Sequence, residues 1–449
     1  MTTSTRPQPG PARAYHFPIF DRLALANGLT LLVAPTHGLP VVTVFAIVDA
    51  GAVAETHGQE GIAELTARAL NEGTPKYGGE ELTDSMEQLG TSVGGAANWD
   101  SASLAMTVLR ANLDSAFAHF AEVLITPTFP AAAIERLKGE RIAELMQIES
   151  EPRELANEKF DEYIYDVTSR FRLPLGGTKE SVNNLSRNAV VAFHSARYQP
   201  AATTLIVVGD VDTDAVERMV TGALADWSGA AAPNVRANDK PVRKSRAVRI
   251  VRKEDAPQSE VRIGHVGVPR THPDYFSITV MNAVMGGLFS SRINLNLREA
   301  HGYTYGASSA FDWRREAGPF VVGTAVASDV TVPAIQETLK EIDRMRTEPI
   351  SESELSLATS YLEGVFPIRY ETTAAIAAAL ATLTIYGLPA DWYDTYRARI
   401  SAVTVNDVLG AARAHVHPES LQIVIVGDAA AIHDPLEALA FGPLDVVSP

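Results

Sequence analysis

Apolar residues along the chain follow two spacings, and each spacing predicts a different element. Short runs rich in β-branched residues predict buried strands at 41–48, 104–109, 205–208, 261–266 and 320–326. Apolar positions three or four residues apart predict helices at 59–71, 130–148, 274–285, 332–346 and 352–365. Strands and helices are therefore expected in both halves of the chain, with a hairpin signal, Asn27-Gly28, near its start.

The two halves repeat one pattern at a fixed offset. The stretch 200–210, PAATTLIVVGD, matches 418–428, PESLQIVIVGD, and the offset is 418 − 200 = 218. Upstream, Asn188 falls on Asn406 at the same offset. Matching segments in register near the end of each half predict a tandem duplication.

A linker without periodicity, rich in Ala, Pro, Asn and basic residues, occupies 228–245. We therefore expect an α+β fold of two duplicated domains, 18–227 and 246–449, each an antiparallel sheet covered by helices. Residues 1–17 are expected to form a flexible N-terminal arm, because the chain starts with a polar, Pro-rich stretch. This stretch lacks the apolar core of an ordinary signal peptide.

The composition argues against several classes of protein. The formal net charge is −16 at pH 7, whereas a nucleic-acid partner needs a basic surface. No apolar run reaches the roughly 18 residues of a membrane-spanning helix. We therefore expect no membrane partner and a cytoplasmic location, or a periplasmic one if a leader has been removed. The absence of cysteine excludes disulfides, thiolate zinc sites and a cysteine nucleophile.

A helix, a glycine turn and a strand are expected in succession between residues 288 and 310. Gly302 suits the left-handed conformation that ends a helix, and alternation from Tyr303 onward predicts the strand. Arg298 at the helix end and Tyr305 near the strand start both donate hydrogen bonds, which suits an anion or a polarised carbonyl group. The structural alternative is that Arg298 caps helix carbonyls and Tyr305 is half-buried sheet surface.

The stretch 61–74 resembles the zinc-binding helix of the pitrilysin/insulinase family of metallopeptidases. Active members carry His-x-x-Glu-His here, and the Gly and Gly-Thr that frame this motif are present. The motif itself is not. Glu64 stands in place of the first His, Ala67 in place of the Glu, and Arg68 in place of the second His.

Each of these replacements removes part of the zinc chemistry. Two His four residues apart lie on one helix face and chelate one Zn²⁺, while the Glu takes a proton from the metal-bound water. Glu64 and Arg68 instead form a helix pair worth about 0.2–0.5 kcal/mol. Ala67 accepts no proton, so we predict that this chain does not carry out zinc-dependent hydrolysis.

Other candidate metal ligands lack companions in the sequence. Glu144 falls near the family's third zinc ligand, but without His partners we interpret it as a solvated side chain. His415 and His417 lie on one strand face with no third ligand spaced to join them. We therefore predict no metal in this chain.

The stretch 286–305 resembles the second half of the same family. It contains Gly-Gly, Ser-Arg, Leu-Arg-Glu, Gly and Tyr in the family's order, and Arg298 and Tyr305 have the separation of the family's Arg/Tyr pair. The resemblance covers nearly the whole chain. It implies a clamshell in which zinc lies on one inner wall and the Arg/Tyr pair on the other. Some members divide these features between two chains, and this chain resembles the one that keeps Arg/Tyr.

The resemblance implies the non-zinc subunit of a heterodimeric zinc endopeptidase, inactive alone. Zinc would belong to a homologous partner carrying His-x-x-Glu-His, and Arg298 and Tyr305 would donate hydrogen bonds to an unfolded peptide substrate. The resemblance also implies an inner edge strand at 98–106, containing Asn98, Trp99 and Ser101, that pairs with substrate or is purely structural. The alternatives are an inert scaffold or peptide-binding protein, and a stand-alone hydrolase of different chemistry.

Overall fold

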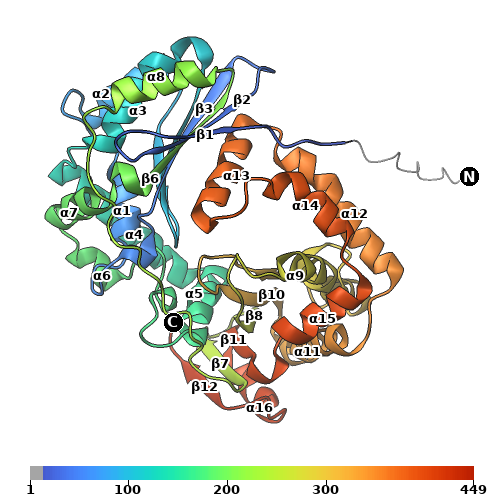
Figure 1. Ribbon diagram of the computed structural model, residues 1–449. Helices are drawn as coiled ribbons and strands as arrows, with labels where there is room; N and C mark the ends of the chain where they lie inside the picture. The colour runs from blue at the N-terminus through green and yellow to red at the C-terminus, as the bar shows by residue number, and fades with distance from the viewer. Residues whose placement is uncertain (1–13) are drawn as a thin grey trace, which may run out of the picture.

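The computed structural model describes residues 14–449 and contains two six-stranded sheets, each covered by helices (Figure 1). The strand order is β1-β2-β6-β3-β5-β4 in the first sheet and β12-β7-β11-β8-β10-β9 in the second. The expected α+β class with two helix-covered sheets is confirmed.

Every strand of the first sheet lies before the linker. These strands are β1 (Asp21–Ala24), β2 (Thr30–Pro35), β3 (Val41–Val48), β4 (Gly94–Ala97), β5 (Ala102–Leu109) and β6 (Thr203–Gly209). The helices of this half are α1 (Ile62–Ala69), α2 (Gly79–Gln88), α3 (Leu113–Ile125), α4 (Ala131–Ser150), α5 (Pro152–Ile164), α6 (Lys179–Asn184), α7 (Arg187–Arg197) and α8 (Thr213–Ala223).

The second sheet is built after the linker. Its strands are β7 (Ala247–Arg252), β8 (Gln258–Val266), β9 (Ala307–Phe311), β10 (Pro319–Ala327), β11 (Gln422–Gly427) and β12 (Leu444–Val447). Its helices are α9 (Tyr275–Asn282), α10 (Arg292–Asn294), α11 (Thr331–Thr347), α12 (Glu352–Arg369), α13 (Thr373–Tyr386), α14 (Trp392–Ser401), α15 (Val405–His415) and α16 (Ala429–Glu437). Two π-helical segments, Ala283–Gly287 and Leu295–Ala300, extend α9 and α10.

Both sheets are mixed, not wholly antiparallel as the sequence predicted. Strand β6 pairs parallel with β2, and β11 pairs parallel with β7, while most other pairs are antiparallel. The short β12 also runs parallel to β7. A parallel pair needs a long crossover connection. In each half, the last long strand returns after the helical segment and inserts into the middle of the sheet.

The repeat at an offset of 218 residues holds for elements as well as for sequence. Helix α7 begins at Arg187 and α15 at Val405, and 405 − 187 = 218. Their last residues, Arg197 and His415, have the same separation. The two halves are therefore copies of one structural unit.

Each half covers the inner face of the other half's sheet with one helix (Figure 1). Helix α13 packs on β3 and β6, and helix α5 packs on β8 and β11. The buried residues beneath α13 are Leu32, Ala34, Ile47, Ile206 and Val208. Because strand side chains alternate, Leu31 and Val33 point to the outer core beneath α1, α3, α7 and α8.

The expected linker and arm are partly bound to the fold. Residues 228–240 contain no helix or strand, but Pro241 pairs with Tyr165 just after α5. Residues 1–13 of the expected N-terminal arm lie outside the described residues. Within the remainder of that arm, Phe17 is buried and stacks on Tyr393, with ring centroids 4.7 Å apart. Residues 14–17 therefore belong to the packed structure.

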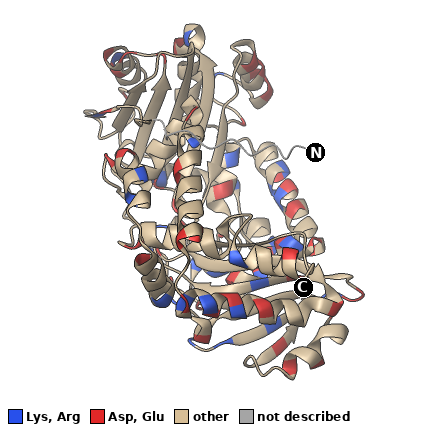
Figure 2. Ribbon diagram, turned by 90° about the vertical axis from the view of Figure 1, so that its right-hand side faces the viewer, with Lys and Arg blue, Asp and Glu red and all other residues tan. Residues whose placement is uncertain are grey.

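Basic and acidic residues are interspersed along the helices of both halves (Figure 2). Among the helices of residues 14–449, none combines the length and apolar character needed to cross a lipid bilayer.

Candidate functional site

Helix α1 carries the positions that correspond to the zinc motif. Its first residues follow Gly61, which has φ +95° and lies so close to Gly176 that an added Cβ would be 2.5 Å from the Gly176 carbonyl oxygen. Ile62, Leu65 and Ala69 are buried, as the helical spacing predicts. Glu64 and Arg68 are less buried and lie one turn apart on another face of the helix.

Arg68 is bound by two carboxylates from different helices. Its Nη2 lies 2.7 Å from Glu64 Oε1, and its Nη1 and Nη2 donate to Glu144 Oε1 and Oε2 at 2.8 and 3.2 Å. Arg141 donates to the same Glu144 at 3.1 Å. The hydrogen bonds from Arg68 lower the pKa of Glu144, and the bond to Glu144 raises the pKa of Arg68. The cluster is an ion-pair network with its charges balanced internally.

This cluster does not fit a zinc ion. The guanidinium of Arg68 lies between the two carboxylates that a metal would need, and it is a permanent cation. Ala67 is fully buried and offers no proton acceptor. The sequence predicted the Glu64–Arg68 pair but treated Glu144 as a solvated side chain, whereas the structure shows that Glu144 accepts hydrogen bonds from Arg68 and Arg141. The structure brings all three side chains together.

The loop that carries Tyr305 differs from the sequence prediction at one point. Gly302 has φ +67° and ends the helical segment, as expected. The strand, however, begins at Ala307 and not at Tyr303. Thr304 causes this delay because its Oγ1 donates to the Ala325 carbonyl at 2.7 Å and accepts from Gly306 N at 3.1 Å, which bends the backbone.

Neither Arg298 nor Tyr305 has the structural role considered as the alternative. The side chain of Tyr305 is 93% exposed, and its hydroxyl has no hydrogen bond among residues 14–449. Arg298 lies over the Phe289 ring at 4.5 Å and its Nε is 3.5 Å from Glu299. In the described part of the chain, the Arg298 side chain donates no hydrogen bond to a carbonyl, and no hydrogen bond or cation–π contact joins it to Tyr305.

A polar cavity of about 370 Å³ adjoins the Tyr305 loop on the inner face of the second sheet. Gly306 and Ser308 line one side of it. Arg262 lines the other side and donates to Asn157 of α5 at 2.7 Å and to Glu260 at 3.0 Å. The polar lining suits a peptide backbone, which needs both donors and acceptors.

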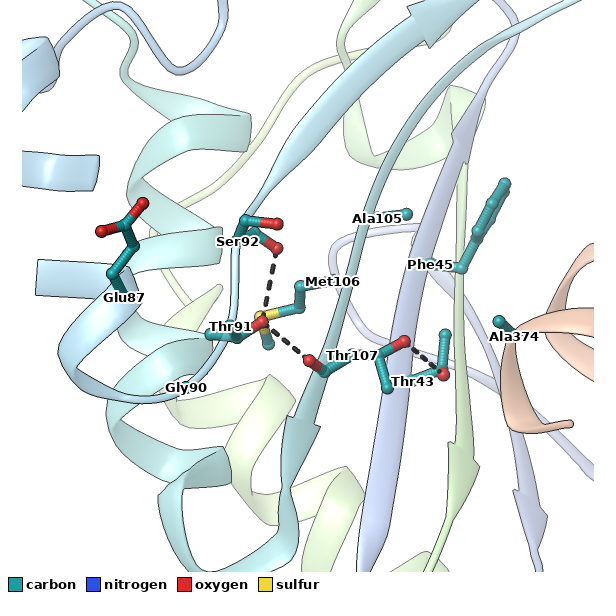
Figure 3. Close-up of a pocket in the computed structure, with 10 residues that line it drawn as sticks. All are labelled: Thr43, Phe45, Glu87, Gly90, Thr91, Ser92, Ala105, Met106, Thr107 and Ala374. Atoms are coloured by element: carbon teal, nitrogen blue, oxygen red, sulfur yellow. Dashed lines mark hydrogen bonds between the residues drawn. The ribbon is translucent and has the colours of Figure 1, made fainter. Parts of the chain in front are cut away.

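A second cavity, of about 650 Å³, opens on the inner face of the first sheet near α13 (Figure 3). Thr43 and Thr107 come from β3 and β5, and their hydroxyls are 2.8 Å apart. Thr91 donates to the Thr107 carbonyl at 2.8 Å from the turn that precedes β4. The two inner faces thus each present a cavity lined partly by strand residues.

The expected substrate strand at 98–106 is wrong in its bounds and its place. Asn98, Trp99 and Ser101 form the turn between β4 and β5, because Asn98 Oδ1 accepts from Ser101 N at 2.8 Å. Strand β5 starts at Ala102 and lies between β3 and β4, so it is not an edge. Trp99 instead packs beneath Arg170 and Arg314. The edge strands are β4 and β9 at these ends of the two sheets.

Two family profiles match most of the chain. Residues 32–174 match the insulinase family of peptidases, family M16, and residues 184–362 match the M16 inactive domain. The chain belongs to peptidase family M16. The gap between the matched segments contains most of α6, and it lies after the degenerate motif and before Arg298 and Tyr305.

Relatives of this M16 chain differ in what their names say about activity. A protein of Streptomyces coelicolor described as an uncharacterized zinc protease is 23% identical over 87% of this chain and 86% of its own length. A non-peptidase homolog from Helicobacter pylori is 24% identical over 87% of this chain and 90% of its own length. The inactive-domain match and the second relative fit an M16 chain that is catalytically inert on its own.

A solved structure shares the fold over nearly its whole length. The M16 inactive domain from Pseudomonas fluorescens superposes with a TM-score of 0.85 at 23% identity, and the match covers 91% of this chain and 98% of that one. The likeness confirms the two-sheet M16 architecture.

The structure also brings together three side chains that the sequence did not connect. His272 and Asp274, before α9, lie beside His415 at the end of α15. The sequence showed His415 and His417 close together, but the companions of His415 lie 141 and 143 residues earlier (415 − 274 and 415 − 272). No local spacing could identify them.

Proposed function

We propose that this M16 chain is the zinc-free subunit of a heterodimeric zinc metalloendopeptidase. In this proposal, Arg298 and Tyr305 donate hydrogen bonds to a peptide held at the zinc of a partner that carries His-x-x-Glu-His. The observation that carries the proposal is the 93% exposed Tyr305, whose hydroxyl has no hydrogen bond among residues 14–449. A polar group left free in this way is available to another molecule.

The loop around Tyr305 is fixed although the side chain is exposed. Thr304 ties the backbone to β10 through Ala325, and its hydroxyl also lies 3.1 Å from that of Thr324. Asn294 Oδ1 accepts from Ala307 N at 3.0 Å on the other side of the loop. A fixed backbone lowers the entropy cost of placing the phenol against a substrate.

The two side chains supply the donors that peptide hydrolysis needs. Attack on a peptide carbonyl places negative charge on its oxygen, and donors aimed at that oxygen lower the barrier. Tyr305 offers one O–H, and Arg298 offers a cation with several N–H groups. Two neighbours hold the Arg298 side chain. The Phe289 ring makes a cation–π contact with it, and Glu299 pairs with its charge.

An extended peptide would add as a further strand to an edge of a sheet. Strands β4 and β9 are edges, and an edge strand presents unpaired N–H and C=O groups to an added strand. Strand β9 starts two residues after Tyr305, so a peptide added there would pass close to the phenol. We therefore propose β9 as the substrate strand, in place of the segment 98–106 that the family resemblance suggested as an inner edge strand.

The decisive experiment mixes this chain with its His-x-x-Glu-His partner and a quenched peptide. Tyr305→Phe should lower kcat by about 10²–10³-fold, the usual loss for one such donor. Tyr361→Phe, an exposed tyrosine on α12, is the matched control and should leave turnover unchanged. Equal turnover with wild-type chain and Tyr305→Phe would contradict the catalytic role.

A second candidate function is an inert scaffold or peptide-binding protein of the same fold. It is favoured by the absence of any hydrogen bond or cation–π contact between Arg298 and Tyr305 in the described structure, and by the non-peptidase name of one relative. Under this alternative, the chain forms a complex with M16 partners, and neither side chain affects turnover. A chelator-insensitive peptidase activity of the lone chain would contradict both functions and indicate a stand-alone hydrolase.

A further inference from the structure

Three potential metal ligands converge in the second half of the chain. His272, Asp274 and His415 each present a ligand atom, and all three atoms lie within 4.8 Å of one another. The imidazole rings of His272 and His415 are T-shaped, with centroids 4.6 Å apart. Helices α9 and α15 pack together here, in the half of the molecule that does not contain α1 (Figure 1).

We propose that His272, Asp274 and His415 form a binding site for a divalent transition metal, with Zn²⁺ the expected ion. Two imidazoles and one carboxylate are a ligand set that binds zinc, and a water molecule would complete the tetrahedron. This site is distinct from the M16 zinc motif, whose positions in α1 are occupied by the Arg68 ion-pair network.

The local sequence holds two of the ligands in place. Pro273 separates His272 from Asp274 and fixes its own φ, so the two side chains are presented from a stiff turn. The turn is closed by His272 N donating to the Pro269 carbonyl at 3.0 Å and by Tyr275 N donating to the His272 carbonyl at 3.1 Å. A stiff turn reduces the ordering cost of binding an ion.

Two of the three ligand atoms are already in close contact, and the third is held by the turn. Asp274 N donates to His272 Nδ1 at 3.1 Å, so this hydrogen bond has to open when either ring nitrogen of His272 binds a metal. His415 Nε2 lies 2.7 Å from Asp274 Oδ2. Ligand atoms around tetrahedral zinc are roughly 3.3 Å apart, so binding needs only a small separation of this pair. The metal would take the place of the proton between His415 Nε2 and Asp274 Oδ2, and the neutral imidazole would keep its one proton on Nδ1. A protonated His415 would release its second proton to solvent.

The third ligand is buried in the helix packing. His415 is 8% exposed and is the last residue of α15, where the helix dipole favours a cation. Asp274 is exposed, which leaves a path for the ion from solvent. A metal here would fasten the end of α15 to the turn before α9, two segments joined in the metal-free protein by the His415–Asp274 bond.

The test uses the purified chain alone, stripped with a chelator and titrated with Zn²⁺ and Co²⁺. One ion per chain should bind, and Co²⁺ should give the visible absorption of a tetrahedral site. Loss of a residue that only orients a metal ligand weakens binding about 10–100-fold. His272→Ala and Asp274→Asn each remove a ligand and should weaken binding by more than this. Zn²⁺ should raise the Tm of the wild-type chain but not of these variants.

A second cluster of potential ligands provides the matched control. His433, Asp434 and Glu437 also lie close together, but they come from one solvent-facing stretch of α16. His433→Ala should bind metal like wild type. The proposal is overturned if the chain binds no metal, if His272→Ala binds as well as wild type, or if His433→Ala abolishes binding. His272 is less buried than His415, so its variant decides the question even if His415→Ala fails to fold.

The metal site does not depend on the proposed peptidase role. The titration contains no partner, so its failure would leave the Tyr305 experiment untouched. If both proposals hold, the heterodimer would contain two zinc ions, one in the partner and one at His272, Asp274 and His415.

Discussion

The two halves repeat one fold but treat their charged and polar groups in opposite ways. In the first half, Arg68 is shared between Glu64 and Glu144, and the cluster is satisfied within the chain. In the second half, the Tyr305 hydroxyl faces solvent at the end of a fixed loop. A satisfied cluster contributes to stability and offers nothing to a partner. An unsatisfied group contributes little to stability and is free to bind, so the proposed function gives one copy a structural role and the other a binding role.

The largest effect should come from the feature that joins the two halves. Leu380 of α13 is fully buried in the core shared with the first sheet, so Leu380→Ala should lower the free energy of unfolding by about 2–5 kcal/mol. Leu357→Ala on α12, where the side chain is 51% exposed, is the control and should change it by less than about 0.5 kcal/mol. Urea unfolding measures both. Similar losses in the two variants would show that α13 does not couple the halves.

The next effect tests whether the first-half cluster is structural. Arg68→Ala leaves Glu64 and Glu144 without their shared cation, and we expect a loss of about 1–3 kcal/mol in unfolding free energy. Arg136→Ala removes a more exposed arginine that also bridges two glutamates, and should cost at most about 1 kcal/mol. Equal losses would mean that the Arg68 network is no more than a surface ion pair.

A smaller effect concerns the ion pair between Arg292 and Glu354, at the start of the helical segment that carries Arg298. Hydrogen bonds from Arg292 hold the pKa of Glu354 at about 2, below the ordinary value of about 4.3. Because the folded-state pKa is lowered, this contribution is present above about pH 4.3 and is lost as the pH falls toward 2. Solvent screening limits it to about 1 kcal/mol.

The difference between two variants isolates this effect. Glu354→Gln should reduce the loss of unfolding free energy between pH 5 and the acid limit by about 1 kcal/mol, whereas Glu352→Gln, exposed on the same helix, should not. Chemical unfolding at several pH values measures the slopes. Parallel curves for wild type and Glu354→Gln would rule out the pair as a source of acid sensitivity.

The smallest stability effect is expected at the proposed functional residues. Tyr305→Phe and Arg298→Ala should each change the unfolding free energy by less than about 0.5 kcal/mol, because neither side chain is bound deeply in the chain. Thermal unfolding of the lone chain measures this. A loss above about 1 kcal/mol in either variant would show that this side chain stabilises the fold, and would weaken the contrast between the halves.

Local features of the fold could be predicted from the sequence. The 218-residue repeat, the left-handed Gly302 and the Glu64–Arg68 pair each depend on residues close together or on a direct sequence match. The prediction of wholly antiparallel sheets was wrong because β6 pairs with β2 across more than 160 residues, and no local pattern encodes that choice. The bounds of the Tyr305 strand were wrong because alternation cannot show that Thr304 bonds to a neighbouring strand.

The parts of the site that the sequence missed depend on distant contacts. An apolar helix such as α13 signals burial but not which sheet it covers. His415 gave a partial signal, since its neighbour His417 drew attention to the segment, yet its companions come from the turn before α9. Whether Arg298 and Tyr305 act on a partner's substrate stays a prediction.

Helix α13 covers the first sheet and helix α5 covers the second, and this arrangement has a consequence for folding during synthesis. The ribosome completes β6 at Gly209, but α13 ends only at Tyr386, which is 386 − 209 = 177 residues later. At about 5–20 residues per second, the first sheet waits roughly 9–35 s for the helix that covers its inner face. During that time Leu32, Ile206 and Val208 remain uncovered on this side. Nascent chains are therefore expected to depend on chaperones until the last third of the protein emerges.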